Sequence, residues 1–223
     1  FLMTSRADGV VLTPPLCDDP DILSLLKDNG TSYASLSPAR QPENTPVMRL
    51  DDRLAAMEMV RHLIEFGHQR IAFIAGPAGH TASTGRHEGY LDAMNEAGLK
   101  VSPELIAEGD YSLRSGLEAA GILIAADPKP TAIFAANDDM AVGAMTAVMA
   151  AGLQVPSQIS IAGFDDTRLA SAVWPPLTTI RQPVAEMGRR AAERLMSSDG
   201  DDAVEEVFDF ELIIRQSTGK TSA

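Results

Sequence analysis

The most regular feature of this sequence is an alternation of short apolar runs with segments in which apolar residues recur every three to four positions. The run 132–136 has the continuous apolar character of a strand that is buried on both faces. The segment 51–67 has helical spacing, starts with acidic residues that can cap a helix, and closes on a glycine. The expected strands are residues 8–14, 31–36, 47–50, 70–76, 104–111, 132–136, 159–164, 177–182 and 207–218, and the expected helices are residues 19–30, 51–67, 83–98, 112–126, 138–152 and 184–197, with a short polar helix after residue 164. Strands and helices that alternate over short connections indicate βαβ units, so we expect an α/β fold with parallel sheets covered by helices.

Two of the expected strands end abruptly on a polar side chain that also stands at a helix start. Asn137 follows the run 132–136, and Asp165 follows the run 159–164. Ligands of open α/β sheets bind outside the carboxyl ends of the strands, whereas Asn and Asp at a helix start also cap the first turn. For these two residues the spacing supports both interpretations equally. Capping is favoured over ligand or metal binding for the other acidic residues at helix starts, which are Asp52, Asp138, Asp139 and Asp166.

Two further loops that leave strands carry candidate ligand groups. The glycine-rich segment 76–90 matches neither common phosphate-binding pattern, but it brings Arg86 into the first turn of a helix, with His80 and Ser83 before it. A guanidinium there is either an ordinary solvated group or a forked donor directed at a ligand. Tyr111 ends the segment 104–111, where its ring either stacks on a sugar or base or covers the core.

Charge and composition narrow the classes of function. The 223 residues contain 18 Lys and Arg against 31 Asp and Glu, which gives a net charge of −13. Nucleic-acid binding needs clustered basic residues, so we do not expect this chain itself to bind DNA. The sequence has no uninterrupted apolar stretch long enough to span a membrane and no signal-peptide pattern. Its single cysteine, Cys17, excludes an internal disulfide and fits a reducing compartment.

No catalytic or metal-binding pattern stands out. The sequence lacks GxSxG, HExxH and CxxC. Its histidines have no metal-ligand spacing with cysteines, and we interpret His68 as a structural residue. We therefore expect no enzyme activity, no cofactor and no bound metal.

Four motifs spread over nearly the whole chain are typical of one protein family. They are RHLIEFGHQRIAFIAGP, GRHEGYLDAMNEAGL, AIFAANDDMAVGAMTAVMAAGLQVPSQISIAGFDD and PPLTTIRQPVAEMGRRAAERL. Together they resemble the lactose-repressor (LacI/GalR) family of bacterial transcription regulators. A strand followed by Asn-Asp and a helix also occurs in periplasmic sugar-binding proteins, but VPSQISIAGFDD followed by PPLTTIRQP is more typical of the regulators.

The resemblance implies two Rossmann-like lobes of the periplasmic binding protein type, with an effector bound between them. The N-terminal lobe would comprise residues 1–46 and 183–208, and the C-terminal lobe residues 47–182 and 209–223. The effector contacts of the family then fall on Arg86, Asn137 and Asp165, with Tyr111 as the aromatic ring that stacks on the effector and with His80 and Ser83 in the loop before Arg86.

The function implied is that of an effector-binding and dimerisation core of a cytoplasmic regulator, whose effector controls operator binding. The alternative is a periplasmic sugar-binding protein of a transport system. Leu36 and Ser37 stand where many members of the family place a polar or aromatic contact. This departure argues against purine effectors, and we expect a sugar or small glycoside.

The family begins with a helix-turn-helix, a hinge helix, and the first strand and helix of the N-terminal lobe. The start of this chain, FLMTSRADGVVLTPP, resembles a later part of that lobe. We therefore expect a fragment with an incomplete N-terminal lobe. Its apolar strand at GVVLTP would have a bare edge, which we expect to recruit a partner, to swap or to be poorly ordered.

Overall fold

The chain divides into two compact units. The computed structural model describes residues 7–40, 42–197 and 204–221. The first unit comprises Phe1–Asp51 and Pro183–Asp209, and the second comprises Asp52–Gln182 and Phe210–Ala223. Because β3 (Val47–Leu50) belongs to the sheet of the first unit, the first boundary lies after Asp51 and not before Val47, where the sequence interpretation placed it.

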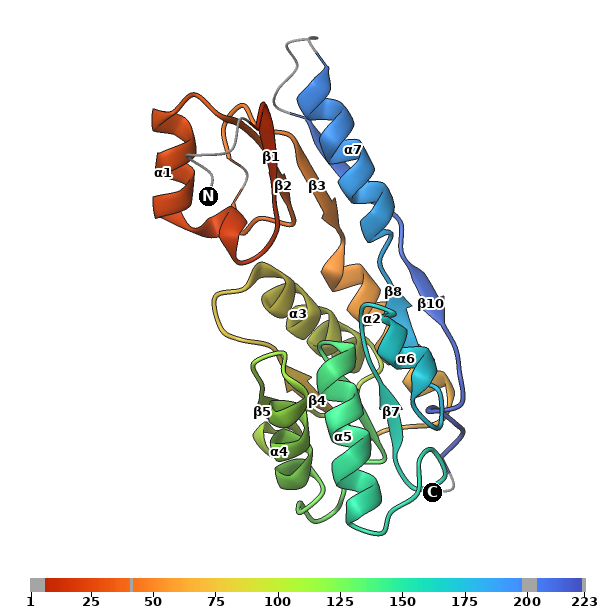
Figure 1. Cartoon of the computed structure of the whole chain (residues 1–223). Helices are drawn as coiled ribbons and strands as arrows, with labels where there is room; N and C mark the ends of the chain where they lie inside the picture. The colour runs from red at the N-terminus through yellow and green to blue at the C-terminus, as the bar shows by residue number, and fades with distance from the viewer. Residues whose placement is uncertain (1–6, 41, 198–203, 222–223) are drawn as a thin grey trace. The chain divides into compact units, whose positions relative to one another are not determined.

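The first unit is a parallel sheet with a helix on each face. Its strand order is β1 (Gly9–Leu12), β2 (Ser32–Leu36), β3 and β9 (Glu205–Phe208). Helix α1 (Pro20–Asp28) packs its Leu26 with Leu12 and Cys17. Helix α7 (Val184–Met196) covers β1, β2 and β3, and its Met187 and Ala191 form a separate core cluster with Ala34 and Met48 (Figure 1). Each helix therefore buries its apolar stripe against its own side of the strands.

Strand β1 stands at the edge of this sheet. It pairs with β2 along Gly9–Leu12, and within the described residues no strand pairs with its other side. The structure thus shows the bare edge that the sequence indicates. Recruitment of a partner by this edge, or swapping through it, stays a prediction, and residues 1–6 lie outside the described part of the chain.

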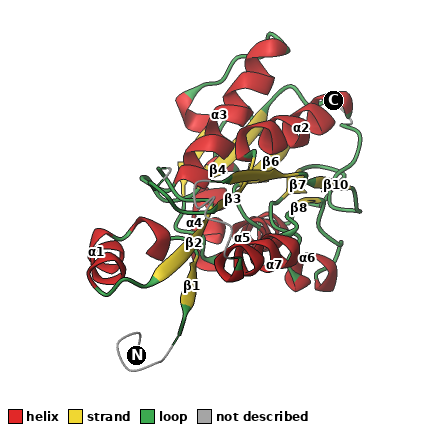
Figure 2. Ribbon diagram, turned by 90° about the horizontal axis from the view of Figure 1, so that it is seen from above, coloured by secondary structure: helices red, strands yellow, loops and turns green. Residues whose placement is uncertain are grey.

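The second unit is a parallel sheet covered by two layers of helices. Its strand order is β5 (Ile106–Glu108), β4 (Ile71–Ala75), β6 (Ala132–Ala135) and β7 (Ser160–Ala162). Helices α2 (Asp52–Glu65) and α3 (Thr81–Glu96) lie on one side of it, and α4 (Leu113–Leu123) and α5 (Asp138–Ala150) lie on the other (Figure 2). Strands β4 and β6 are wholly apolar and almost wholly buried, as a sheet with both faces covered requires.

Glycines let the helices within each layer approach closely. A methyl group on Gly89 of α3 would lie 2.1 Å from the carbonyl oxygen of Arg53 in α2. Between α4 and α5, the corresponding distances are 2.2 Å from Gly116 to Met140 O and 2.1 Å from Gly143 to Leu113 O. No side chain fits in either contact, so these glycines set the spacing of the helix pairs.

The end of the chain differs from the sequence interpretation. The single strand expected over 207–218 is two strands in different sheets, because the chain passes from the first unit to the second near Asp209. Strand β9 joins the first unit, and β10 (Glu211–Ile213) pairs antiparallel with β8 (Thr179–Arg181). Of the acidic segment 197–206, which we expected to be a solvated loop, residues 198–203 lie outside the described residues and Glu205–Glu206 begin β9.

Buried histidines attach the C-terminal segment to the second unit. The ring of His68 contacts Thr131 Oγ1 at 2.9 Å, Ser160 Oγ at 3.1 Å and Gly219 O at 3.0 Å. His62 contacts Thr218 Oγ1 at 3.1 Å. His68 is therefore a structural residue, in agreement with the sequence interpretation. Burial lowers the pKa of both rings, so they favour the neutral form.

None of the helices in the described ranges combines the length and the apolar character that a membrane-spanning helix needs.

Candidate functional site

Neighbouring strands of the second unit bring the candidate residues to one edge of its sheet. Strands β4, β6 and β7 are parallel neighbours, so their carboxyl ends meet at the same edge. Asn137 follows β6, and Asp165 follows β7. The loop after β4 leads into α3, which carries Arg86. The strand-end positions that the sequence singles out are thus adjacent in the structure.

Arg86 is the most constrained side chain of the site. Its side chain is only 6% exposed. Its Nε donates to Asp52 Oδ1 at 2.8 Å, and its Nη1 donates to the carbonyl oxygen of Ala136 at 2.6 Å. The guanidinium carbon lies 3.6 Å from the centre of the Phe164 ring, which is a cation–π contact. Three kinds of contact therefore fix the guanidinium before any ligand arrives.

Two acidic neighbours keep the guanidinium of Arg86 protonated and therefore positively charged. Burial by itself lowers the pKa of Arg86, but the negative charges of Asp52 and Asp165 outweigh this and hold the pKa above its usual value. Nη2 forms no hydrogen bond with any of the described residues. Nη2 and the second hydrogen of Nη1 are therefore left on this fixed, charged guanidinium for a ligand.

Asp165 presents a carboxylate next to the guanidinium of Arg86. Its Oδ1 accepts from Gln182 Nε2 at 2.6 Å and lies 3.6 Å from Arg86 Nη1. Its φ of 115° is a backbone conformation that side-chain-bearing residues rarely adopt. Burial raises the pKa of Asp165, and the charge of Arg86 and the hydrogen bond from Gln182 oppose this only partly. The side chain stays 29% exposed, so it is accessible as an acceptor.

Asp138 and Asp166 hold the strained turn at Asp165, and neither is the helix cap that we expected. Asp138 is fully buried and accepts from Thr167 N at 2.7 Å and from Thr179 Oγ1 at 2.6 Å. Asp166 forms ion pairs with Arg181 at 2.7 Å and Arg215 at 2.6 Å. Both carboxylates therefore attach the segment after β7 to the second unit. The capping prediction was wrong because each carboxylate binds partners that lie far away in the sequence.

Asn137 acts as the N-cap of α5. Its Oδ1 accepts from Met140 N at 3.0 Å, and its Nδ2 donates to Tyr111 O at 3.0 Å. Of the two interpretations that the sequence left open, helix capping is therefore the one that the structure shows. Because Nδ2 carries a second hydrogen, a ligand contact by Asn137 is compatible with this geometry.

Tyr111 lies over the loop after β4. A methyl group on Gly76 would lie 2.4 Å from the tyrosine ring, so the ring packs directly on this glycine. The centre of the His80 ring lies 5.8 Å away in an edge-on arrangement. The Tyr111 hydroxyl is buried and makes no hydrogen bond of normal geometry in the described part of the chain, although burial raises the Tyr111 pKa and Ser83 is near enough to oppose that rise. Ser83, one turn before Arg86, is also buried. A buried hydroxyl without such a bond is a group that a ligand can satisfy.

Sequence reasoning misses three residues of the site, which are Asp52, Phe164 and Gln182. Asp52 begins a helix, which favours a cap, and nothing in the sequence indicates that Arg86, 34 positions later, meets it. Phe164 is the last residue of an expected apolar strand, and nothing in the sequence indicates that its ring contacts Arg86. Gln182 follows β8, so the rule that ligand groups follow strand ends could have identified it.

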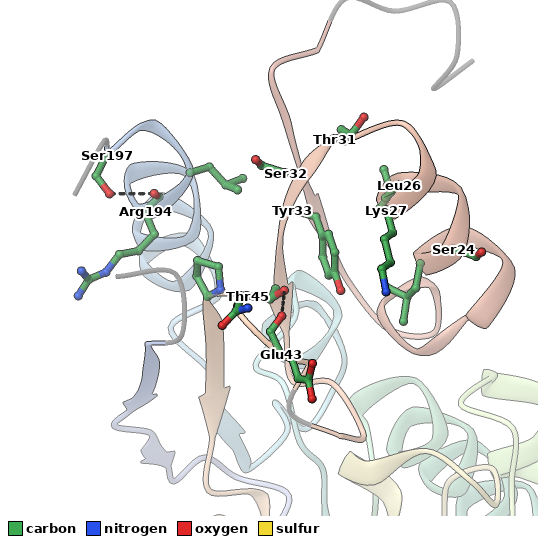
Figure 3. A pocket seen from close by; sticks show the side chains of 15 residues that line it. Ser24, Leu26, Lys27, Thr31, Ser32, Tyr33, Glu43, Thr45, Arg194 and Ser197 are labelled. Atoms are coloured by element: carbon green, nitrogen blue, oxygen red, sulfur yellow. Dashed lines mark hydrogen bonds between the residues drawn. The ribbon is translucent and has the colours of Figure 1, made fainter. Parts of the chain in front are cut away.

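Two pockets are lined by other residues, and their lining side chains offer fewer charged groups to a ligand. A pocket of about 760 Å³ in the first unit is lined by α1, the start of β2, the loop before β3 and the end of α7 (Figure 3). The guanidinium of Arg194 points away from this pocket in Figure 3 and donates to Glu206 at 2.6 Å. A second pocket of about 540 Å³, in the second unit, is lined mostly by apolar residues around the exposed Trp174. Within residues 7–40, 42–197 and 204–221, no three His, Cys, Asp or Glu side chains are grouped so that they could hold a metal.

Comparison with known proteins identifies the family. Residues 60–218 match the periplasmic binding protein-like domain family. The chain is 37% identical over 225 residues to the HTH-type transcriptional repressor PurR of Pasteurella multocida, a match that covers 97% of this chain and 66% of the relative. It therefore spans slightly less than two thirds of that relative's length.

Solved structures agree with this match. A LacI family transcriptional regulator from Mycobacterium smegmatis superimposes with a TM-score of 0.85 at 31% identity, covering 98% of this chain and 81% of that chain. A complex of the transcriptional regulator CelR with cellobiose also gives a TM-score of 0.85 at 31% identity, covering 97% of this chain and 67% of that chain. The chain belongs to the LacI family of transcriptional regulators and carries their periplasmic binding protein-like domain.

Proposed function

We propose that this chain is the effector-binding core of a transcriptional repressor and that its second unit binds an effector through Arg86 and Asp165. The observation that carries this proposal is the fixed guanidinium of Arg86, whose Nη2 makes no hydrogen bond within the described residues and whose Nη1 lies 3.6 Å from the partly exposed carboxylate of Asp165. A hydroxyl group can accept from such a donor and donate to such an acceptor at the same time. Several hydroxyls on one molecule would use the remaining groups, so the site suits a sugar or small glycoside.

Tyr111, Asn137, His80 and Ser83 complete the proposed contact set. The ring of Tyr111 offers a flat apolar surface, and its buried hydroxyl makes no hydrogen bond of normal geometry among the described residues. The second amide hydrogen of Asn137 and the ring of His80 lie near that tyrosine. The cellobiose in the CelR complex supports a carbohydrate as the class of effector to test first.

Effector binding would control a second event, which we propose to be operator binding by the whole regulator. With a net charge of −13 this chain is a poor ligand for DNA, so we assign DNA contact to a part of the regulator outside these 223 residues. An effector changes operator binding only if its affinity differs between the two states of the regulator. Because the relatives are transcriptional regulators, this proposal is favoured over a periplasmic transport protein.

We further propose that the chain forms a homodimer in the cytoplasm, where a repressor meets its operator. Helix α4 supports this with an apolar surface: Leu113 and Leu117, one turn apart, are 41% and 38% exposed. A second copy of the chain would remove this surface from water.

The binding proposal is tested with site variants in a thermal-shift titration against mono- and disaccharides, cellobiose included. Asp165→Asn keeps the size of the side chain but loses its charge and replaces one acceptor oxygen with an NH2 donor, and we expect a loss of affinity of roughly tenfold or more. Arg86→Ala should lose binding too. It will also lower stability by about 3–5 kcal/mol, because buried carboxylates lose their counter-charge. Asp92→Asn, on α3, is the matched control because Asp92 is 34% exposed and pairs with Arg53 instead of Arg86, and it should bind like the wild type. Equal affinity in wild type and Asp165→Asn would refute the site.

A further inference from the structure

We infer that Asp52 makes this site select uncharged hydroxylated effectors over anionic ones. The inference rests on the proposed function and names the charge class of the effector. The side chain of Asp52 is 13% exposed and that of Arg86 is 6% exposed, and Asp52 Oδ1 accepts from Arg86 Nε at 2.8 Å. The charge of the guanidinium is thus compensated inside the protein before a ligand arrives.

The remaining hydrogen-bonding capacity of Arg86 also disfavours an anion. Arginine usually holds a carboxylate or phosphate through two parallel N–H groups. Here Asp52 accepts the only hydrogen of Nε, so the edge formed by Nε and Nη2 is occupied, and one hydrogen of Nη1 is donated to the carbonyl of Ala136. The hydrogens that remain, on Nη2 and on Nη1, are enough for a hydroxyl, whereas an anion would have to share the guanidinium with Asp52 and the carbonyl of Ala136.

The charges around Arg86 also disfavour an anionic ligand. Asp165 lies 3.6 Å from Arg86, so two carboxylates surround one guanidinium. The charge of Asp139, in the first turn of α5, acts on Asp165 as well and makes the surroundings more acidic. An arriving anion would meet this excess of negative charge in a partly buried site, where like-charge repulsion is screened least. The net charge of −13 on the chain adds a weaker, longer-range repulsion.

An uncharged polyol meets none of these obstacles. Its hydroxyl can donate to Asp165 and accept from Arg86 Nη2, and it brings no further charge into the site. Asp52 would therefore be a specificity-determining residue that acts through Arg86, without needing to touch the effector itself.

The experiment compares matched neutral and anionic ligands on the full chain at constant ionic strength and a pH of about 7.5, where the carboxylates of the anionic sugars are ionised. The pairs are galactose with galacturonate, glucose with glucuronate, and cellobiose with cellobiose monophosphate, and inorganic phosphate is a separate anionic probe. The variants are wild type, Asp52→Asn, Asp139→Asn and the control Asp92→Asn. Asp52→Asn can still accept from Arg86 Nε but carries no charge. Circular dichroism checks that each variant is folded.

We expect wild type to bind the neutral member of a recognised pair at least about tenfold more tightly than the anionic member. Asp52→Asn should shrink that ratio by about tenfold and should gain measurable affinity for phosphate, while Asp92→Asn should change neither. Asp139→Asn should move the ratio in the same direction by less. If Asp52→Asn does not fold, the Asp139→Asn result and the neutral-to-anion ratio of the wild type decide the question.

Two results would overturn the inference. One is wild-type binding of the anionic member as tight as that of the neutral member. The other is a folded Asp52→Asn that shows neither a changed ratio nor a gain of phosphate binding. If no sugar pair binds to wild type, the proposed function loses its support, but the phosphate titration still decides the role of Asp52.

Discussion

At the scale of single residues, the site depends on a guanidinium whose partners come from three different segments. Asp52, Ala136 and Phe164 fix Arg86, and Asp165 lies beside it. Replacing any one of these residues acts on the others, because they share one buried charge. Substitutions in this site should therefore be measured singly and combined in double variants, and each should keep the size and shape of the side chain.

Asp138 gives a prediction for the dependence of stability on pH. Burial raises the pKa of Asp138 to about 6, although Thr179 and Thr167 donate hydrogen bonds to it. A carboxyl group whose pKa is higher in the folded state stabilises the fold at pH below its unfolded pKa of about 3.9, and this contribution is lost as pH rises through about 6. We expect the difference in unfolding free energy between wild type and Asp138→Asn to shift against the wild type from about pH 4 to about pH 7. Urea denaturation at several pH values measures this, and a difference that does not depend on pH would contradict it.

The sequence interpretation proposes Arg86, Asn137, Asp165 and Tyr111 as ligand contacts; the structure places them near one another, and their role in binding stays a prediction. It could do so because parallel strands of an α/β sheet bring their ends to one edge. It could not tell a helix cap from a buried ion partner at Asp52, Asp138 or Asp166. That distinction depends on contacts between residues far apart in the chain.

At the scale of elements, close helix pairs shape the second unit. The periodicity of apolar residues predicts α4 and α5, but a glycine within a helical pattern does not reveal whether it faces solvent or a neighbouring backbone. Gly116 and Gly143 face a backbone, whereas a methyl group added to Gly121 of the same α4 would meet no neighbouring atom within 4 Å. Similarly, the run 207–218 shows strand character but not that Asp209 divides it between two sheets.

Alanine substitutions at these glycines test the packing. Gly143→Ala would place its methyl group 2.1 Å from Leu113 O, so we expect a loss of stability of about 1–3 kcal/mol or more. Gly121→Ala should instead raise stability by up to about 1 kcal/mol, because alanine favours the helix. Thermal and urea unfolding of the two variants measure the difference. A Gly143→Ala variant as stable as Gly121→Ala would show that α4 and α5 are less closely packed than described.

At the scale of the whole molecule, two parallel-sheet units are built from a chain that passes between them repeatedly, so each unit is completed by a distant segment. This is the architecture that the four sequence motifs imply for the LacI family, and the structural matches confirm the fold. The sequence shows the order of the elements, but the point at which each unit begins depends on which sheet β3 and β9 join.

The proposed dimer gives a prediction at this scale. We expect light scattering coupled to size exclusion to report a dimer at micromolar concentration, and Leu117→Glu to shift it toward monomer, because a charge would be buried in the contact. Leu91→Glu, on α3 of the same unit with the comparable exposure of 36%, should leave the dimer intact. A monomer at all concentrations, or equal effects of the two variants, would contradict this surface.

The central claim is that the second unit binds an uncharged hydroxylated molecule through Arg86 and Asp165. Calorimetric titration of cellobiose and a panel of simple sugars into wild type and Asp165→Asn tests it most directly. We predict saturable binding of at least one of these sugars to wild type and affinity weaker by about tenfold or more, on the order of 1.4 kcal/mol, in the variant. Binding of that sugar with the same affinity to both proteins would contradict the account.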